Sequence, residues 1–305
     1  MSSSGRTRAA GGALLCALAL AQAPSAQAST DPPAVTVAGH GGAPTYVLVS
    51  GMMGGVAGYR RLEGELLARG ARVVVVDPYA LSLDSAAVTF ADLARRVDQA
   101  LVRLGVDSAH VVGHAHGGGV ALRLAALDPA RVAALTLLDV GALPQNRTKV
   151  FSGAIRLVPL IARMPGGRRF VRAQILRGVR QNAGRHGWLD TATQRAYTEP
   201  VLRRIGRVVA MAGRLAETRE SERLEQVVAR VRAPVTVILG EVPHPSGPDS
   251  AEFAVLAPLG ARLRIVRLAG VGHFPHEEAP ADVARYLATA PAARGAALPA
   301  RPGPR

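Results

Sequence analysis

The sequence predicts an α/β protein with a mostly parallel central sheet, helices on both faces of that sheet, and an inserted helical cap. Two observations support this fold class. Apolar runs rich in valine, isoleucine and leucine alternate with amphipathic segments, which is typical of strands that helices cover on both faces. The alternation stops once, from residue 141 to residue 232, and then resumes. The interruption therefore reads as a cap inserted into one core.

The first half of the core contains four expected strands. Thr45–Ser50 and Arg72–Asp77 are apolar enough to be buried strands, and the amphipathic segment between them ends at Gly70, a residue favoured at helix C-termini. Next we expect a helix over 89–105, a strand over 110–114, a helix over 117–127 and a strand over 132–139.

The second half of the core follows the cap. Here we expect strands over 234–240 and 262–268 and a closing helix over 280–290. The predicted core therefore comprises residues 29–140 and 233–290, with the cap at 141–232. Residues 291–305 are mostly Pro, Ala, Arg and Gly, and we expect a disordered tail.

The N-terminal residues resemble an export signal. Arg6 and Arg8 precede an apolar run over 11–21, and a small-x-small site for a signal peptidase ends at Ala28. The apolar run is too short to span a bilayer. We therefore expect residues 1–28 to be a signal peptide that is cleaved near Ala28, with export to the cell envelope or the medium.

Composition limits the chemistry of the exported part. Cys16 is the only cysteine and lies in the signal, so disulfides and a thiolate nucleophile are excluded. The net charge is +15, and Lys149 is the sole lysine. An aromatic content of 4% leaves little for base stacking, so no nucleic-acid partner is expected. Seven arginines between residues 156 and 180 indicate a weaker alternative, in which the basic cap docks on an anionic surface.

Residues 111–122, with the sequence VVGHAHGGGVAL, read as a strand, a tight glycine-flanked turn and the start of a helix. Such a turn holds a nucleophilic side chain at the edge of a sheet. Its apex is Ala115, between Gly113 and Gly117. A methyl group can neither attack a carbonyl nor donate a proton. The turn is therefore predicted to lack its nucleophile.

Two further motifs accompany this turn. VSGMMGG, over 49–55, follows the first central strand, and GVGHFPHEEAPADVARYL spans 270–287. Together, the three motifs resemble the α/β-hydrolase fold family, in particular its capped esterase, lipase and lyase branch. The resemblance extends from about residue 45 to residue 290, and the last motif is the most specific of the three.

The resemblance implies roles for several residues. His273 corresponds to the family's catalytic histidine and would act as a base. The backbone amides of Met52 and His116 correspond to oxyanion donors. Ser50 and Gly51 lie in the oxyanion loop, where the family usually carries His-Gly. Ser50 replaces that histidine, and a hydrogen bond within the turn is favoured for it over a role as a displaced nucleophile.

The departures from the family pattern are equally specific. Ala115 occupies the vacated nucleophile position, which excludes a serine-hydrolase mechanism. The position where the family usually carries its acid holds Pro243. Either Asp139 or Glu241 could still orient His273, and the sequence does not choose between them.

A metal site built from histidines is not expected. His114, His116, His244 and His273 supply enough ligands, but residues that flank a sharp turn point to different sides. No other cofactor is expected either. The resemblance thus favours an exported protein that binds a small carbonyl-containing ligand without ester hydrolysis. The alternative is a hydrolase or lyase in which His273 acts without a serine.

A weaker alternative is an NAD(P)-binding fold. The glycines over 51–58 precede a strand that ends at Asp77, and the spacing from Gly113 to Gly118 with Asp139 repeats the pattern of a dinucleotide-binding turn. The cap interval, the His273 motif and the export signal argue against it.

Overall fold

The computed structural model describes residues 34–42, 44–52, 54–80, 88–140, 156–217, 219–247 and 253–289. The predicted signal peptide and C-terminal tail lie outside these ranges, as do residues 141–155 at the start of the predicted cap.

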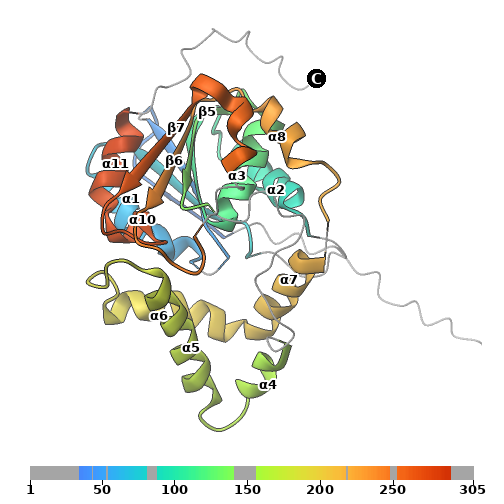
Figure 1. Cartoon of the computed structure of the whole chain (residues 1–305), viewed down its shortest axis with the longest axis vertical. Helices are drawn as coiled ribbons and strands as arrows, with labels where there is room; N and C mark the ends of the chain where they lie inside the picture. Colours follow the sequence, from blue (N-terminus) through green and yellow to red (C-terminus); the bar gives the residue numbers. More distant parts are fainter. Residues whose placement is uncertain are drawn as a thin grey trace, which may run out of the picture.

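A seven-stranded sheet forms the centre of the molecule (Figure 1). Its strands are β1 (Ala34–Ala38), β2 (Thr45–Val49), β3 (Arg72–Asp77), β4 (Ala109–His114), β5 (Val132–Leu138), β6 (Val235–Gly240) and β7 (Leu263–Leu268). The strand order is β1-β3-β2-β4-β5-β6-β7, and every neighbouring pair is parallel except β1 with β3. The predicted fold class is therefore confirmed. The antiparallel edge strand β1 is an addition that the sequence analysis missed.

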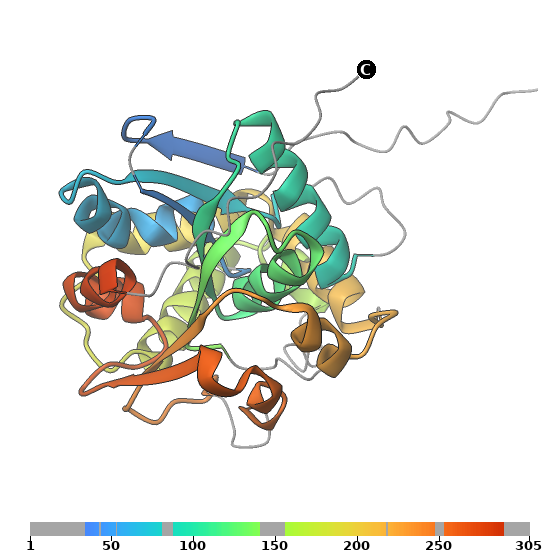
Figure 2. The ribbon, with the colours of Figure 1, turned by 90° about the horizontal axis from the view of Figure 1, so that it is seen from above.

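Helices cover both faces of this sheet (Figure 2). One face carries α1 (Arg60–Leu67) and α11 (Pro280–Thr289), and the other carries α2 (Phe90–Arg103), α3 (His116–Leu127) and α8 (Leu224–Arg230). Side chains alternate between the two faces: Val49 and Val76 pack with α2 and α3, whereas Leu48 and Val75 pack with α1 and α11. This two-sided burial explains the continuous apolar runs of the central strands.

The strand order argues against the dinucleotide-binding alternative. Without β1, the order is β3-β2-β4-β5-β6-β7. A dinucleotide-binding sheet places its first three strands successively outward, in the order 3-2-1-4-5-6. Apart from β1, β3 is the only strand on the outer side of β2, and the next strand in the chain, β4, lies on the other side of β2. The topology therefore differs in the half that would bind the cofactor.

Four helices of the insertion between β5 and β6 lie beyond the carboxyl edge of the sheet (Figure 1). They are α4 (Val158–Ile161), α5 (Gly167–Asn182), α6 (Thr191–Arg203) and α7 (Ile205–Glu217). The fifth, α8, packs against α3, and its Val227 and Val228 belong to the main core cluster. Helix α8 lies within the predicted cap at 141–232 but packs with the core. Within the described ranges, no helix is both long and apolar enough to cross a membrane.

The remaining short elements connect strands to helices. They are η1 (Val56–Tyr59), η3 (Ala257–Arg262) and α10 (Pro275–Glu278). The parallel strands β2 to β7 all end at one edge of the sheet. The loops after them carry the residues that the sequence motifs selected, which is where open α/β sheets bind ligands.

Candidate active site

The tight turn between β4 and α3 is present and strained. Ala115 has φ 48° and ψ −123°, a backbone conformation that non-glycine residues rarely adopt. Its amide donates to the carbonyl of Leu138 at 3.1 Å, and its carbonyl accepts from Gly118 at 2.9 Å. These two hydrogen bonds fix the apex between β5 and the first turn of α3. The alanine is thus held in the geometry of a nucleophile position.

Glycines make the turn possible because the backbones approach closely. A Cβ at Gly113 would lie 2.6 Å from the carbonyl oxygen of Gly117, and a Cβ at Gly117 would lie 2.4 Å from that of Val49. Both obstacles are backbone atoms, which cannot move aside as a side chain can. The glycines of this motif are therefore required for packing, whatever residue occupies the apex.

Asp139 and His273 form the chemical centre of the site. Asp139 follows β5 with φ 44°, and its Oδ2 accepts a hydrogen bond from Nδ1 of His273 at 2.6 Å. The Asp139 side chain is 1% exposed and that of His273 is 12% exposed. A proton on Nδ1 leaves Nε2 of His273 with a lone pair, as a base requires. Glu241, the other candidate acid, is exposed on the loop after β6.

His244 is an unexpected second partner of Asp139. Its Nε2 lies 3.1 Å from the same carboxylate oxygen, and its side chain is almost fully buried. Burial alone would raise the pKa of Asp139, but hydrogen bonds from His244 and His273 outweigh it and hold that pKa below its usual range. The carboxylate is therefore ionised near neutral pH and shared between two imidazoles.

The same three side chains could also hold a metal ion. One ligand atom from each of Asp139, His244 and His273 lies within 4.8 Å of the others, and this is the only such group among the described residues. Two histidines with one carboxylate suit a divalent transition metal. The four histidines weighed from the sequence do not form that group, since His114 and His116 are not part of it. The two hydrogen bonds to Asp139 account for the arrangement without an ion.

The histidines that flank the apex have different surroundings. Nε2 of His114 lies 2.8 Å from the carbonyl oxygen of His273, so His114 supports the loop that carries the base. His116 packs beside Phe90, and burial lowers its pKa to about 4, which keeps the ring neutral. As the first residue of α3, His116 has a backbone N–H without an intrahelical acceptor. The oxyanion role that the resemblance implies for this amide stays a prediction.

The loop after β2 lies against the apex. Ser50 Oγ donates to the carbonyl of Val76 at 3.2 Å, so its hydroxyl is engaged with the backbone of β3. Gly51 is close to the turn, since a Cβ there would be 3.7 Å from the methyl group of Ala115. Met52 continues from this loop into a pocket. The structure thus gathers the oxyanion loop, the vacated apex and the Asp139–His273 pair at one edge of the sheet.

Glu278 holds this arrangement together, and the sequence analysis gave it no role. Its Oε2 accepts from the amides of Gly184, Arg185 and Gly272 at 2.8, 2.7 and 3.0 Å, and its Oε1 accepts from Phe274 at 3.1 Å. One buried carboxylate therefore ties the end of α5 to the loop that carries the base. A further hydrogen bond links the same two segments, since the amide of His273 donates to the carbonyl oxygen of Asn182 at 2.8 Å.

We expect Glu278→Gln to destabilise the protein strongly. The amide that replaces one oxygen would face backbone N–H donors instead of accepting from them, and each lost hydrogen bond to a charged group contributes about 1.5–3 kcal/mol. Thermal unfolding measures the effect. The matched control is Glu241→Gln, which makes the same change at an exposed side chain and should leave the midpoint unchanged. Equal midpoints for both variants would contradict this role of Glu278.

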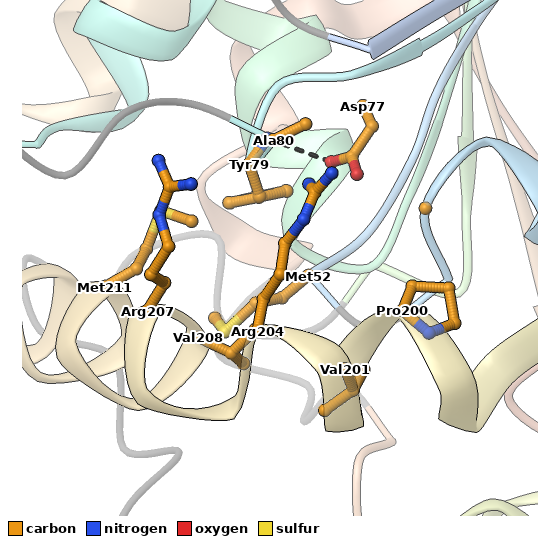
Figure 3. A pocket seen from close by; sticks show the side chains of 11 residues that line it. Met52, Asp77, Tyr79, Ala80, Pro200, Val201, Arg204, Arg207, Val208 and Met211 are labelled. Carbon is orange, nitrogen blue, oxygen red and sulfur yellow. Dashed lines mark hydrogen bonds between the residues drawn. The ribbon is translucent and has the colours of Figure 1, made fainter. Parts of the chain in front are cut away.

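A pocket opens beside the oxyanion loop, between the core and the cap (Figure 3). It encloses about 570 Å³ of space free of atoms, part of which is open to solvent. The lining residues are Met52, Gly55, Asp77, Tyr79, Ala80, Pro200, Val201, Arg204, Arg207, Val208 and Met211. The core supplies the first five of these residues, and α6, α7 and the residue between them, Arg204, supply the rest. The pocket therefore lies between the sheet and the helical insertion.

Polar groups in the pocket are arranged around Asp77. Figure 3 shows Arg204, which lies between α6 and α7, reaching toward this carboxylate, and the amide of Tyr79 donates to Asp77 Oδ1 at 2.9 Å. Burial raises the pKa of Asp77 to about 6, against the opposing effects of the Tyr79 amide and Arg204. The hydroxyl of Tyr79 is buried and has no hydrogen-bond partner among the described residues.

Comparison with known proteins fits this geometry. A family profile described as "alpha/beta hydrolase fold" matches residues 44–174, from β2 into α5. The protein has the α/β-hydrolase fold. The structural family resemblance drawn from the three motifs is thus confirmed.

The matching relatives include proteins named "Putative carbamate hydrolase RutD". That of Variovorax paradoxus (strain S110) is 35% identical over 133 residues, which is 42% of this chain and 48% of the relative. The matched part spans less than half the length of these relatives.

Solved structures agree over more of the chain. A membrane phospholipase A described as a bacterial virulence factor aligns with a TM-score of 0.64 and 22% identity, over 83% of this chain and 79% of that one. An alpha/beta hydrolase fold protein from Burkholderia ambifaria aligns with the same score and identity, over 83% and 92%. At these identities, the likeness extends to the fold alone.

Proposed function

We propose that this α/β hydrolase binds a small carbonyl compound and hydrolyses it by direct attack of water, without forming an acyl-enzyme. The observation that carries the proposal is the 2.6 Å hydrogen bond between Asp139 and His273. It supplies an oriented base beside a turn that keeps the nucleophile geometry but holds only the methyl group of Ala115.

The proposed reaction needs only these residues, two backbone amides and one water molecule. Nε2 of His273 takes a proton from a water molecule as that water's oxygen bonds to the substrate carbonyl carbon. The carbonyl oxygen becomes an oxyanion, which the backbone amides of Met52 and His116 stabilise. As the intermediate collapses, the leaving group departs with the proton from His273. Asp139 stabilises the imidazolium between these two steps.

Rates below those of serine hydrolases follow from this mechanism. In the reference case of subtilisin, enzymes without the triad retain about 10³–10⁴-fold acceleration over water, from the oxyanion hole and binding. Such an acceleration is measurable only with an activated or a well-bound substrate. The pocket favours a partly apolar substrate, because Met52, Val208 and Met211 line it beside Arg204 and Arg207. The name of the relatives adds carbamates to esters as candidates.

A second candidate function is binding without turnover. Ala115 favours it, because the side chain at the apex has no lone pair for a carbonyl carbon. In that case the pocket serves as a receptor for the same class of carbonyl compound. The protein would then have lost ester hydrolysis while keeping its ligand.

Turnover of a panel of chromogenic acyl esters and aryl carbamates distinguishes the two functions. Hydrolysis without a burst, without a covalent adduct in the mass spectrum and without sensitivity to a chelator supports water activation by His273. Ligand-induced thermal stabilisation without turnover supports the receptor. Activity that a chelator removes and zinc restores would instead assign catalysis to a metal at Asp139, His244 and His273.

We also propose that the protein acts outside the cytoplasm. Support comes from Arg6, Arg8, the apolar run over 11–21 and the cleavage site that ends at Ala28. N-terminal sequencing of the protein recovered from its source should start just after Ala28. An N-terminus at Met1 would contradict export.

A further inference from the structure

Exposed apolar residues gather in α4, beside it and at the start of α5. These segments lie at the end of the insertion that is farthest from the sheet (Figure 1). Leu157, Leu160, Met164 and Phe170 are 57%, 60%, 58% and 53% exposed, and we call these four residues the cap tip. In the described part of the chain, only four other large hydrophobic residues are exposed: Val37, Val102, Leu127 and Ile265. Half of this set thus falls within 14 successive positions.

The cap tip is not a face left over from incomplete packing. Other apolar residues of the same helices have partners, since the partly buried Val158 and Ile161 of α4 and Ile175 of α5 pack with the buried Val171 in one cluster. That cluster is completed by Leu202 of α6. Leu160 of α4 and Phe170 of α5 are instead exposed, together with Leu157 and Met164 beside α4. Exposed apolar residues that gather in this way are typical of an interaction site.

Arginines surround the apolar side chains. Residues 156–189 contain eight arginines and no acidic residue. Arg163 and Arg169 are exposed between members of the cap tip, and Arg168 beside them donates to the carbonyl of Leu202 at 3.2 Å. Arg172, further along α5, pairs with Glu199 of α6. The region therefore carries a strong local positive charge, whatever the net charge of the rest of the protein.

We propose that the cap tip docks on an anionic lipid bilayer. Apolar side chains mixed with arginines on one surface suit the boundary between headgroups and acyl chains, where the arginine stems lie along apolar surface and their heads meet phosphates. A nucleic acid would engage the arginines but leave Leu160 and Phe170 in water. The charge complementarity with anionic lipids and the exposed apolar residues together select the bilayer as the occupant.

Binding to vesicles tests the proposal independently of any catalysis. The chain has a single tryptophan, Trp188, which is buried, so Phe170→Trp adds a reporter at the cap tip. Its emission should shift to the blue with vesicles of phosphatidylcholine and phosphatidylglycerol, and far less with phosphatidylcholine alone. Binding should weaken as salt is raised, but the blue shift of the bound fraction should remain.

Variants separate the apolar contribution from the charge. In co-sedimentation with the mixed vesicles, Leu160→Ser with Phe170→Ser should reduce partitioning by about tenfold or more, given the apolar area each side chain buries. Arg163→Gln with Arg169→Gln should reduce it by about fivefold per arginine. Val102→Ser with Leu127→Ser changes two apolar residues of similar exposure on the core, and should have no effect. Arg95→Gln with Arg285→Gln removes the same charge from the core, with only a small effect expected.

Three outcomes would overturn docking by the cap tip. The first is equal partitioning of the parent and of Leu160→Ser with Phe170→Ser, when both have the same unfolding midpoint. The second is an equal loss in the core arginine variant, which would assign binding to net charge alone. The third is no vesicle binding together with a dimer that Phe170→Ser dissociates, which would make a second copy of the chain the occupant.

Discussion

Ala115→Ser should turn this protein into a conventional serine hydrolase. The apex already has the strained backbone of a nucleophile turn, with φ 48° and ψ −123°, so the substitution adds one oxygen to a Cβ that is already in place. His273 offers Nε2 as the base because Asp139 occupies its Nδ1. In subtilisin, removing the serine costs about 2 × 10⁶ in turnover. We therefore expect a gain of at least about 10³-fold on short acyl esters.

Covalent labelling makes this result specific. The variant should bind one equivalent of a serine-reactive phosphonate, visible by mass spectrometry on the peptide that contains residue 115, and the parent should not react. Ala115→Ser combined with His273→Ala is the control, and it should lose both labelling and turnover because the hydroxyl no longer has a base. If Ala115→Ser alone gains neither labelling nor activity, Nε2 of His273 does not reach the apex, and the catalytic proposal fails with it.

The tight turn with Ala115 at its apex could be predicted from the sequence because it depends largely on local constraints. Gly113 approaches the backbone of Gly117 and Gly118, so this constraint acts within the motif itself, whereas the approach of Gly117 to the backbone of Val49 depends on the fold. The alternation of apolar strands and amphipathic helices is local as well. The edge strand β1 was missed because Ala34–Ala38 is short and only its Val35 packs against the core.

Contacts between residues that are distant in the sequence could not be predicted in this way. Asp139 and His273 are 134 positions apart, and their contact depends on the positive φ with which Asp139 leaves β5. His244 contacts Asp139 only because β6 lies beside β5 in the sheet. Glu278 binds amides from two segments, one of which belongs to the cap. Sequence spacing carries no information about such contacts until the topology is known.

The last prediction concerns which of the two candidate acids, Asp139 or Glu241, supports His273. Asp139→Asn should reduce turnover of the Ala115→Ser variant by about 10²–10⁴-fold. In the parent protein the reduction should be smaller, because its turnover is already low. The amide cannot stabilise an imidazolium, and it favours the wrong tautomer of His273, which lowers turnover by about 10⁴ in the chymotrypsin triad. Initial rates at saturating ester, together with an unfolding midpoint, measure the effect.

Two matched variants decide whether Asp139 acts through His273. Glu241→Gln alters the other acid that the sequence left open and should have no effect, because that side chain is exposed on the loop after β6. His244→Gln removes one hydrogen bond from Asp139 but keeps the one to His273, so turnover should fall far less than in Asp139→Asn. If turnover instead falls as much in His244→Gln as in Asp139→Asn, both imidazoles are needed together with the Asp139 carboxylate. A shared metal ion would then explain their common dependence better than an acid that serves a single base.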